Sequence, residues 1–240
     1  MKILGIHDLS VKLGKQERIR FVTTDWEFED AKSLLVLRGQ NGSGKTTLLN
    51  VLSGHLSPTK GEATLDGAIL SGHGPSAATK FGIVRGFQIP LFCTELKIWE
   101  NIMLTANLCW WERADRVRNA VMKRLSDMGL KDCVDRSPIE LSFGQRRIAE
   151  LVRVEFQVKQ PGAKLVLLDE PLAGLDNRHR VDALHLIENI IDLQIPMIVV
   201  EHDDGLDYLT DCVKQVELVR SGADCYFESL SPMAMGGRVY

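Results

Sequence analysis

Hydrophobic residues follow two patterns that take turns along this chain: continuous apolar runs, and stretches in which they recur at helical spacing. Three short runs, at residues 33–38, 165–170 and 197–201, are mostly apolar, and the last two end in acidic residues. Runs of this kind are typical of strands buried on both faces of a parallel sheet. Between them, in stretches such as 48–52 and 176–193, hydrophobic residues recur at helical spacing. Strands that alternate with helices predict an α/β fold with a mostly parallel sheet.

The region from about residue 92 to residue 159 is helical in texture. One hydrophobic helix face within it is formed by Ala114, Val117, Val121, Leu125 and Met128. Gly129 then ends this helix. Because the region lies between a predicted strand at 82–88 and the apolar run at 165–170, we expect an inserted α-helical subdomain there.

The N-terminal part has the pattern of antiparallel β structure. Residues 3–28 alternate in part between apolar and polar positions, and Asp66-Gly67 lies between two short β-prone runs. An Asp-Gly pair in this setting is a strong hairpin signal. We therefore expect an antiparallel β subdomain around the first strand of the α/β core, all within a single domain over residues 1–240.

Composition narrows the possible classes of function. The chain of 240 residues carries 29 basic and 32 acidic residues, a formal net charge of −3. Proteins held to nucleic acid mainly by charge are usually basic, so no nucleic-acid partner is expected. No apolar run approaches the length of a membrane span, and the N-terminus lacks a signal-peptide core. The chain is not expected to cross a membrane by itself.

The five cysteines are scattered and form no Cys-x-x-Cys pair. They are Cys93, Cys109, Cys133, Cys212 and Cys225. This spacing favours reduced thiols in a cytosolic protein over a zinc site or a disulfide framework.

A phosphate-binding loop pattern, Gly, four residues, Gly-Lys-Ser/Thr, follows the first apolar run. The matching residues are Gly39, Gln40, Asn41, Gly42, Ser43, Gly44, Lys45, Thr46 and Thr47. Glycines allow phosphate oxygens to approach backbone N–H groups, and the helix that begins near Lys45 directs its positive dipole end at them. Lys45 can reach the β- and γ-phosphates, and the Thr46 hydroxyl can ligate Mg²⁺. The alternative is a glycine-rich turn with a surface lysine, but the flanking strand and helix favour the phosphate loop.

Two acidic residues end the second apolar run. A phosphate-loop enzyme needs an acid at a strand end beside the loop to hold Mg²⁺ through water, and Asp169 fits this role. Glu170 should point elsewhere and could polarise an attacking water. Taken alone, the same pattern also fits a buried strand that ends in solvated acids.

The third element is Leu141-Ser142-Phe143-Gly144-Gln145, which precedes a helical run. A serine and a glycine at a helix N-terminus can form a second anion site, which would aid hydrolysis if it faced a γ-phosphate on another subunit. The alternative is an ordinary serine N-cap.

These three elements together resemble the nucleotide-binding subunit of an ABC (ATP-binding cassette) transporter, and the resemblance covers nearly the whole chain. Residues 39–47 are similar to the family's Walker A motif, 165–170 to Walker B and 141–145 to the signature motif Leu-Ser-Gly-Gly-Gln. Phe143 replaces the first glycine of that signature. Residues 173–176, Ala-Gly-Leu-Asp, resemble the D-loop.

The resemblance implies a site, two cofactors and partners. It implies ATP bound by the Walker A residues, and across a head-to-tail dimer by Ser142, Gly144, Gln145 and Asp176 of the second subunit. Thr46, Gln88 and Asp169 would hold Mg²⁺. Gln88 matches the Q-loop glutamine, Glu170 the catalytic base and His202 the switch histidine that senses the γ-phosphate. The other implied partners are transmembrane permease subunits, which would place the chain peripherally on the cytoplasmic face of the cell membrane.

One position departs from the family pattern. The family usually stacks adenine on an aromatic residue before Walker A, and the matching place holds Leu13. We expect Leu13 to lie against the base, or Phe21 or another nearby ring to supply the stack.

The subgroup of the family, the contact made by residues 87–92, the type of dimer and the class of function are each considered with an alternative. The segments 87–92 and 99–102 are similar to cassettes of branched-chain amino-acid importers. Residues 87–92 are expected either to contact a membrane subunit or to pack beneath the helical lobe. Every catalytic position is filled, which favours a homodimer with two working sites over a pair with one dead site. A fully competent half of a heterodimer is the alternative. The rival function is a soluble, non-transport ABC ATPase that acts as a clamp or assembly factor. A phosphate-loop kinase or GTPase lacks support, because there is no Asn-Lys-x-Asp guanine motif.

Overall fold

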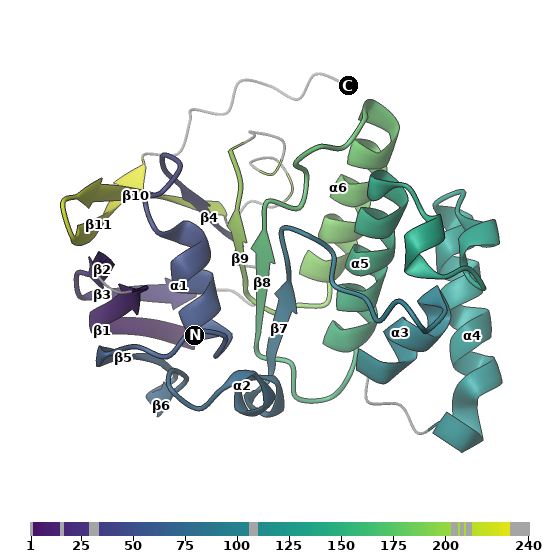
Figure 1. Ribbon diagram of the computed structural model, residues 1–240, viewed down its shortest axis with the longest axis horizontal. Helices are drawn as coiled ribbons and strands as arrows, with labels where there is room; N and C mark the ends of the chain where they lie inside the picture. Colours follow the sequence, from purple (N-terminus) through teal and green to yellow (C-terminus); the bar gives the residue numbers. More distant parts are fainter. Residues whose placement is uncertain are drawn as a thin grey trace.

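The computed structural model describes residues 2–14, 17–28, 34–105, 110–202, 206, 209 and 213–230. Five neighbouring parallel strands form the centre of its sheet (Figure 1). In spatial order they are β7 (Ile83–Gly86), β8 (Leu165–Asp169), β9 (Met197–Val200), β4 (Leu34–Arg38) and β10 (Val213–Ser221). The predicted strand at 82–88 is thus shorter than expected, since Phe87 and Gln88 lie beyond its end.

The two faces of the parallel strands belong to two separate hydrophobic cores. Val36, Val166 and Val199 point into one core, whereas Leu35, Leu167 and Ile198 point into the other. Because both faces are covered, the strands need hydrophobic residues at every position. This explains the continuous apolar runs in the sequence.

The remaining strands build the predicted antiparallel part. They are β1 (Lys2–Leu13), β2 (Glu17–Phe21), β3 (Thr24–Phe28), β5 (Lys60–Leu65), β6 (Ala68–Ile69) and β11 (Asp224–Leu230). β1 pairs antiparallel with β2, β3 and β5. The predicted hairpin joins β5 to β6, with Asp66 (φ 52°) and Gly67 (φ 77°) both left-handed, as a tight hairpin turn requires. β11 pairs with β10 and with β2, so all eleven strands belong to one sheet.

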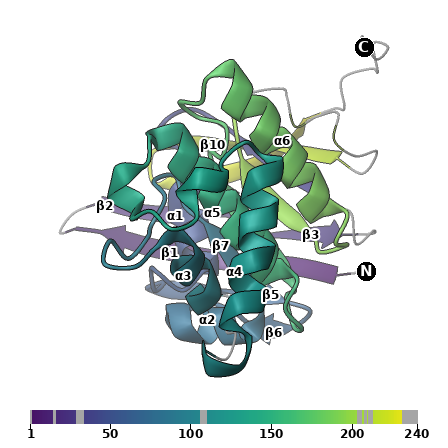
Figure 2. The ribbon, with the colours of Figure 1, turned by 90° about the vertical axis from the view of Figure 1, so that its right-hand side faces the viewer.

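Helices cover both faces of the parallel strands. They are α1 (Lys45–Leu52), α2 (Pro75–Phe81), α3 (Ile98–Thr105), α4 (Trp110–Asp127), α5 (Phe143–Val158) and α6 (Asn177–Ile191), with short 3₁₀ turns at Lys131–Cys133 and Pro138–Glu140. Figure 1 shows α1 between the antiparallel and the parallel strands, and α5 and α6 on the opposite face of the parallel strands. In Figure 2, α3 and α4 lie in front of α5, on the side away from the sheet. They form the inserted helical lobe.

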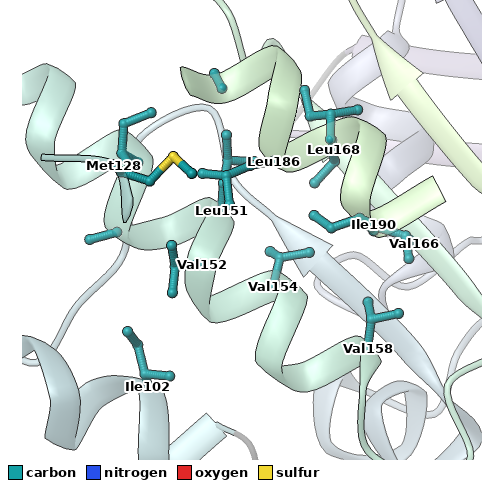
Figure 3. Close-up of a cluster of buried hydrophobic side chains, with 14 of the residues drawn as sticks. Ile102, Met128, Leu151, Val152, Val154, Val158, Val166, Leu168, Leu186 and Ile190 are labelled. Carbon is teal, nitrogen blue, oxygen red and sulfur yellow. The ribbon is translucent and has the colours of Figure 1, made fainter. Parts of the chain in front are cut away.

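The helical lobe shares one core with the sheet. Figure 3 shows Val154 and Val158 of α5 beside Val166 and Ile190, whereas Val152 lies towards Ile102 of α3. All six side chains are buried. Helix α5 is therefore packed on both sides, and its N-terminus is held in a fixed place relative to β8.

Three further predictions from the sequence concern the start of helix α5, the cysteines and membrane spans. Helix α5 begins at Phe143, four residues before the predicted run at Arg147, because Ser142 caps it. Cys93, Cys133 and Cys225 are free thiols, whereas Cys109 and Cys212 lie outside the described residues. None of the described helices is both long enough and apolar enough to span a membrane.

Candidate functional site

The phosphate loop connects β4 to α1, as the sequence predicts. Gly42 (φ 82°) and Gly44 (φ 105°) are left-handed, a conformation that costs other residues about 1–2 kcal/mol. A Cβ on Gly42 would meet no described atom within 4 Å, so within the chain itself the requirement for glycine there is conformational. Gly44 is the N-cap of α1, whose first N–H groups have no intrahelical acceptors and can therefore bind an anion.

Lys45 lies folded over this loop. Its ammonium donates hydrogen bonds to the carbonyl oxygens of Gly39 (2.6 Å) and Gln40 (3.0 Å), and only 6% of the residue is exposed. Burial lowers the pKa of Lys45, while the nearby carboxylates of Glu170 and Asp169 act to raise it. The side chain is therefore positioned beside the loop, where a phosphate can replace the carbonyl oxygens.

Asp169 joins the loop to the end of β8. Its Oδ1 accepts a hydrogen bond from Thr46 Oγ1 at 3.3 Å, and its Oδ2 accepts one from Arg85 at 2.8 Å. Burial lowers the pKa of Arg85, and the Asp169 carboxylate acts to raise it. Sequence reasoning missed Arg85, although a charged residue within a strand that is otherwise apolar was a signal.

The donor set at this point suits Mg²⁺. The described residues contain no group of three or more His, Cys, Asp or Glu side chains able to hold a metal. Mg²⁺ is commonly held by one or two carboxylates together with substrate phosphates. The hydroxyl of Thr46 and the carboxylate of Asp169 beside a phosphate loop match that requirement.

Gln88, Glu170 and His202 converge next to Asp169. Glu170 has a left-handed backbone (φ 45°), which turns its side chain away from the line of β8. Its Oε2 accepts a hydrogen bond from Gln88 Nε2 at 2.6 Å, and its Oε1 lies 3.7 Å from His202 Nε2. The side chains of Gln88 and His202, which are far from Glu170 in the sequence, thus lie beside its carboxylate.

Two further charged residues, which sequence analysis did not select, support this cluster. Arg38 donates to the carbonyl oxygen of His202 at 3.2 Å. Glu201 is 4% exposed and accepts hydrogen bonds from the backbone N–H groups of Leu172 (3.1 Å) and His202 (2.9 Å). A buried glutamate therefore ties the turn after β8 to the residue after β9.

Ser142, Gly144, Gln145 and Asp176 form a separate group. Ser142 Oγ accepts from the Gln145 N–H (3.2 Å) and Gln145 Oε1 accepts from the Ser142 N–H (2.9 Å), a capping box. The ordinary N-cap alternative is therefore realised in this structure. None of these four residues lines the cavity beside the phosphate loop of the same chain.

The two parts of this second group contact each other. Asp176 caps α6 and accepts from the His179 N–H at 2.9 Å, and its Oδ2 lies 2.8 Å from His179 Nδ1. A Cβ on Gly144 would lie 2.9 Å from that imidazole nitrogen, so the signature-like segment packs against the start of α6.

Leu13 lines a cavity beside the phosphate loop. This cavity of about 330 Å³ is lined by Leu13, Ile19, Asn41, Gly42, Gly44, Lys45, Thr46, Thr47, Glu170 and Arg220. The proposed alternative, Phe21, is wrong: it is fully buried and packs against Phe227, with the two ring centroids 6.2 Å apart. A buried ring cannot receive a base.

Comparisons with known proteins agree with this geometry. Residues 25–173 match the family model described as ABC transporter. The chain is 31% identical to a spermidine/putrescine import ATP-binding protein of Chromobacterium violaceum, over 85% of this chain and 54% of the relative. It is 27% identical to a probable branched-chain amino acid transport ATP-binding protein of Archaeoglobus fulgidus, over 93% of this chain and 88% of the relative. The chain thus spans about half the length of several curated relatives, 54%, 52% and 57% of three of them.

Solved structures show the same fold. A dimeric ATP-binding cassette in a post-hydrolysis state with ADP and Pi has a TM-score of 0.75 at 20% identity, covering 95% of this chain and 99% of that one. A nucleotide-free cassette from an ABC transporter has a TM-score of 0.69 at 22% identity, covering 94% and 90% of the two chains.

Proposed function

The chain belongs to the ABC transporter family, and we propose that it binds and hydrolyses ATP as the cassette subunit of such a transporter. The observation that carries this proposal is the convergence of Gln88, Glu170 and His202 beside the phosphate loop. The alternative is a buried strand that merely ends in solvated acids. That alternative does not explain why an amide and an imidazole lie beside one of those acids.

The roles of the residues follow from their positions. The loop amides and Lys45 bind the phosphates, and the ammonium exchanges the carbonyl oxygens of Gly39 and Gln40 for phosphate oxygens. Mg²⁺ would be held by Thr46 and Asp169, with Gln88 close by, and would neutralise charge on the phosphates. Glu170 then accepts a proton from the water that attacks the γ-phosphorus, and ADP leaves. Gln88 and His202 orient the Glu170 carboxylate from either side.

The second group of residues supports a head-to-tail dimer. Ser142, Gly144 and Gln145 do not line their own chain's phosphate-loop cavity. A serine hydroxyl and helix N–H groups at the start of α5 can bind an anion supplied by another chain. We infer that they complete the ATP site of a second copy, with Asp176 beside them. Because every catalytic position is filled, a homodimer then has two working sites.

A surface next to the catalytic residues supports a membrane partner. Ile89 and Leu91, in the loop that follows Gln88, are 70% and 60% exposed, whereas Phe92 packs against the core. Exposed apolar side chains gathered on one loop indicate a contact surface. We propose that transmembrane permease subunits cover this loop, which would hold the chain at the cytoplasmic face of the membrane. Relatives named as import proteins favour an importer. The sequence motifs, and the relative named as a branched-chain amino acid transport protein, favour the branched-chain amino-acid type.

The substitution Glu170→Gln tests the proposal. It keeps the size and hydrogen bonding of the side chain but removes the charge that accepts the water proton. We expect ATP to bind normally, hydrolysis to fall by about 10²–10⁴-fold, and a dimer to accumulate with ATP in light scattering. The matched control is Glu228→Gln, an exposed glutamate on β11, which should leave turnover unchanged. Turnover close to normal in Glu170→Gln would contradict the assignment.

A further inference from the structure

The cavity beside the phosphate loop contains a cation outside the phosphate-binding motif. Besides loop residues and Glu170, its lining consists of two aliphatic side chains, Leu13 and Ile19, and Arg220. None of the described residues that line it is aromatic. A base bound in this cavity would therefore meet no ring among them, and Arg220 offers a planar cationic group there.

Arg220 is held in place by the backbone. Its Nε donates to the Gly222 carbonyl oxygen at 3.0 Å, within the turn that joins β10 to β11. Its Nη1 donates to the Gly42 carbonyl oxygen at 3.1 Å, in the phosphate loop itself. Since β10 also pairs directly with β4, the strand that leads into this loop, the position of Arg220 is fixed relative to the bound phosphates.

The two hydrogen bonds fix the orientation of the guanidinium plane, because the N–H groups of a guanidinium lie in its plane. Stacking uses the flat face and leaves both bonds intact. Guanidinium groups stack on aromatic rings and on nucleobases, a cation–π contact that is stronger where the site excludes water.

We propose that Arg220 stacks on the nucleobase and so replaces the aromatic ring that is missing at Leu13. The inference rests on the proposed ATP-binding function and adds a residue that determines selectivity for a nucleotide over a bare polyphosphate. In this arrangement Lys45 and the loop amides bind the phosphates.

The test compares two probes that differ in whether they carry a base: ATP and inorganic tripolyphosphate. Their affinities for the full chain are measured by calorimetry, for the unmodified protein, Arg220→Met and Arg220→Lys. We expect both variants to lose about 3- to 30-fold in ATP affinity, with less than about twofold change for tripolyphosphate. Lysine keeps the charge but has no flat face, so it should not restore ATP binding. The control is Lys214→Met, which removes a positive charge from an exposed position on the same strand.

A second variant protects the test against a folding defect. Leu13→Tyr in the Arg220→Met background should recover ATP affinity, because a ring at Leu13 returns the flat surface. Equal losses for both probes, or full recovery by Arg220→Lys, would assign Arg220 to the phosphates and overturn the inference. If the unmodified chain bound neither probe, the proposed function itself would fail, and this inference with it.

Discussion

The ion pair between Arg85 and Asp169 is the residue-scale contact that positions the carboxylate proposed to hold Mg²⁺. Their side chains are 6% and 1% exposed and 2.8 Å apart. With Oδ2 committed to Arg85, Oδ1 is the oxygen that faces the Thr46 hydroxyl. The pair therefore supplies a counter-charge for a buried carboxylate and orients it towards the phosphate loop.

Replacement of Arg85 by methionine should destabilise the fold. The variant leaves Asp169 buried without its counter-charge, a change that typically costs 3–5 kcal/mol, so we expect a loss of about that size in urea unfolding. The matched control is Arg118→Met. Its pair with Asp135 is solvent-exposed, at 37% and 47%, and should matter little. Equal effects of the two substitutions would show that the Arg85 pair does not support the structure.

The sequence predicted the acids of this site but not their partners. Asp169 and Glu170 stand at the end of an apolar run, a local signal. Arg85 reaches Asp169 only because β7 pairs with β8 in a parallel register that sets Arg85 opposite Leu167. Glu201 was predicted only as a strand end. Its role in holding the N–H group of Leu172 depends on β8 and β9 lying side by side. Pairing between strands that are far apart in the chain, unlike a tight hairpin, has no short-range signature in sequence.

At the scale of elements, the start of α5 packs against the turn before α6. Phe143, the first residue of α5, lies so close to Gly174 that a Cβ there would be 3.2 Å from Phe143 Cε1. The Phe143 ring also lies 5.8 Å from the Arg147 guanidinium. The residue that replaces the usual glycine of the signature motif thus fills the space over the D-loop-like turn.

A double-mutant cycle measures this contact. Gly174 has a φ of 71°, so Gly174→Ala should cost about 1–2 kcal/mol from backbone strain, plus a term from crowding against the ring. In the Phe143→Gly background the crowding disappears, so the cost of Gly174→Ala should fall by about 0.5–1 kcal/mol in chemical denaturation.

The control for this cycle is Gly72→Ala. Gly72 has a φ of 85°, and a Cβ there would meet no described atom within 4 Å. Its cost should be the same with either residue at position 143. A coupling of zero between positions 143 and 174 would mean that the ring moves aside freely.

Elements were predictable where a single periodicity dominates. Strands β4, β8 and β9 and helix α6 were located within a few residues, because burial on one or both faces imposes a local pattern. The start of α5 was misplaced because Phe143 and Gly144 do not show helical periodicity. Only the cap at Ser142 marks it. The contact of Phe143 with Gly174 could not be foreseen, since it depends on how α5 and α6 pack.

At the scale of the whole molecule, the exposed loop after Gln88 predicts a partner. Leu91→Glu should abolish recovery of the chain with membranes from its native cells, because a charge opposes burial of this loop. ATP affinity should remain unchanged, since Leu91 does not line the cavity beside the phosphate loop. Val181→Glu, at a 65% exposed position on α6, is the matched control and should stay with the membranes. Loss of both properties in Leu91→Glu would favour a structural role for the loop.

In the proposed head-to-tail dimer each chain would hold two half-sites, and mixing two inactive variants tests whether a second chain completes them. Lys45→Ala removes the phosphate-binding lysine, and Ser142→Asp sets a negative charge against phosphate while keeping an oxygen that can cap α5. Each variant alone should lack ATPase activity. A mixed dimer pairs the intact phosphate loop of one chain with the intact Ser142 of the other, so it has one working site. Random pairing makes half of the dimers mixed, so an equal mixture should recover about a quarter of the unmodified activity. Two batches of the same variant, mixed at the same total concentration, are the control. If the mixture stayed inactive although both variants remained folded, Ser142 would not serve the partner's nucleotide and the head-to-tail arrangement would be wrong.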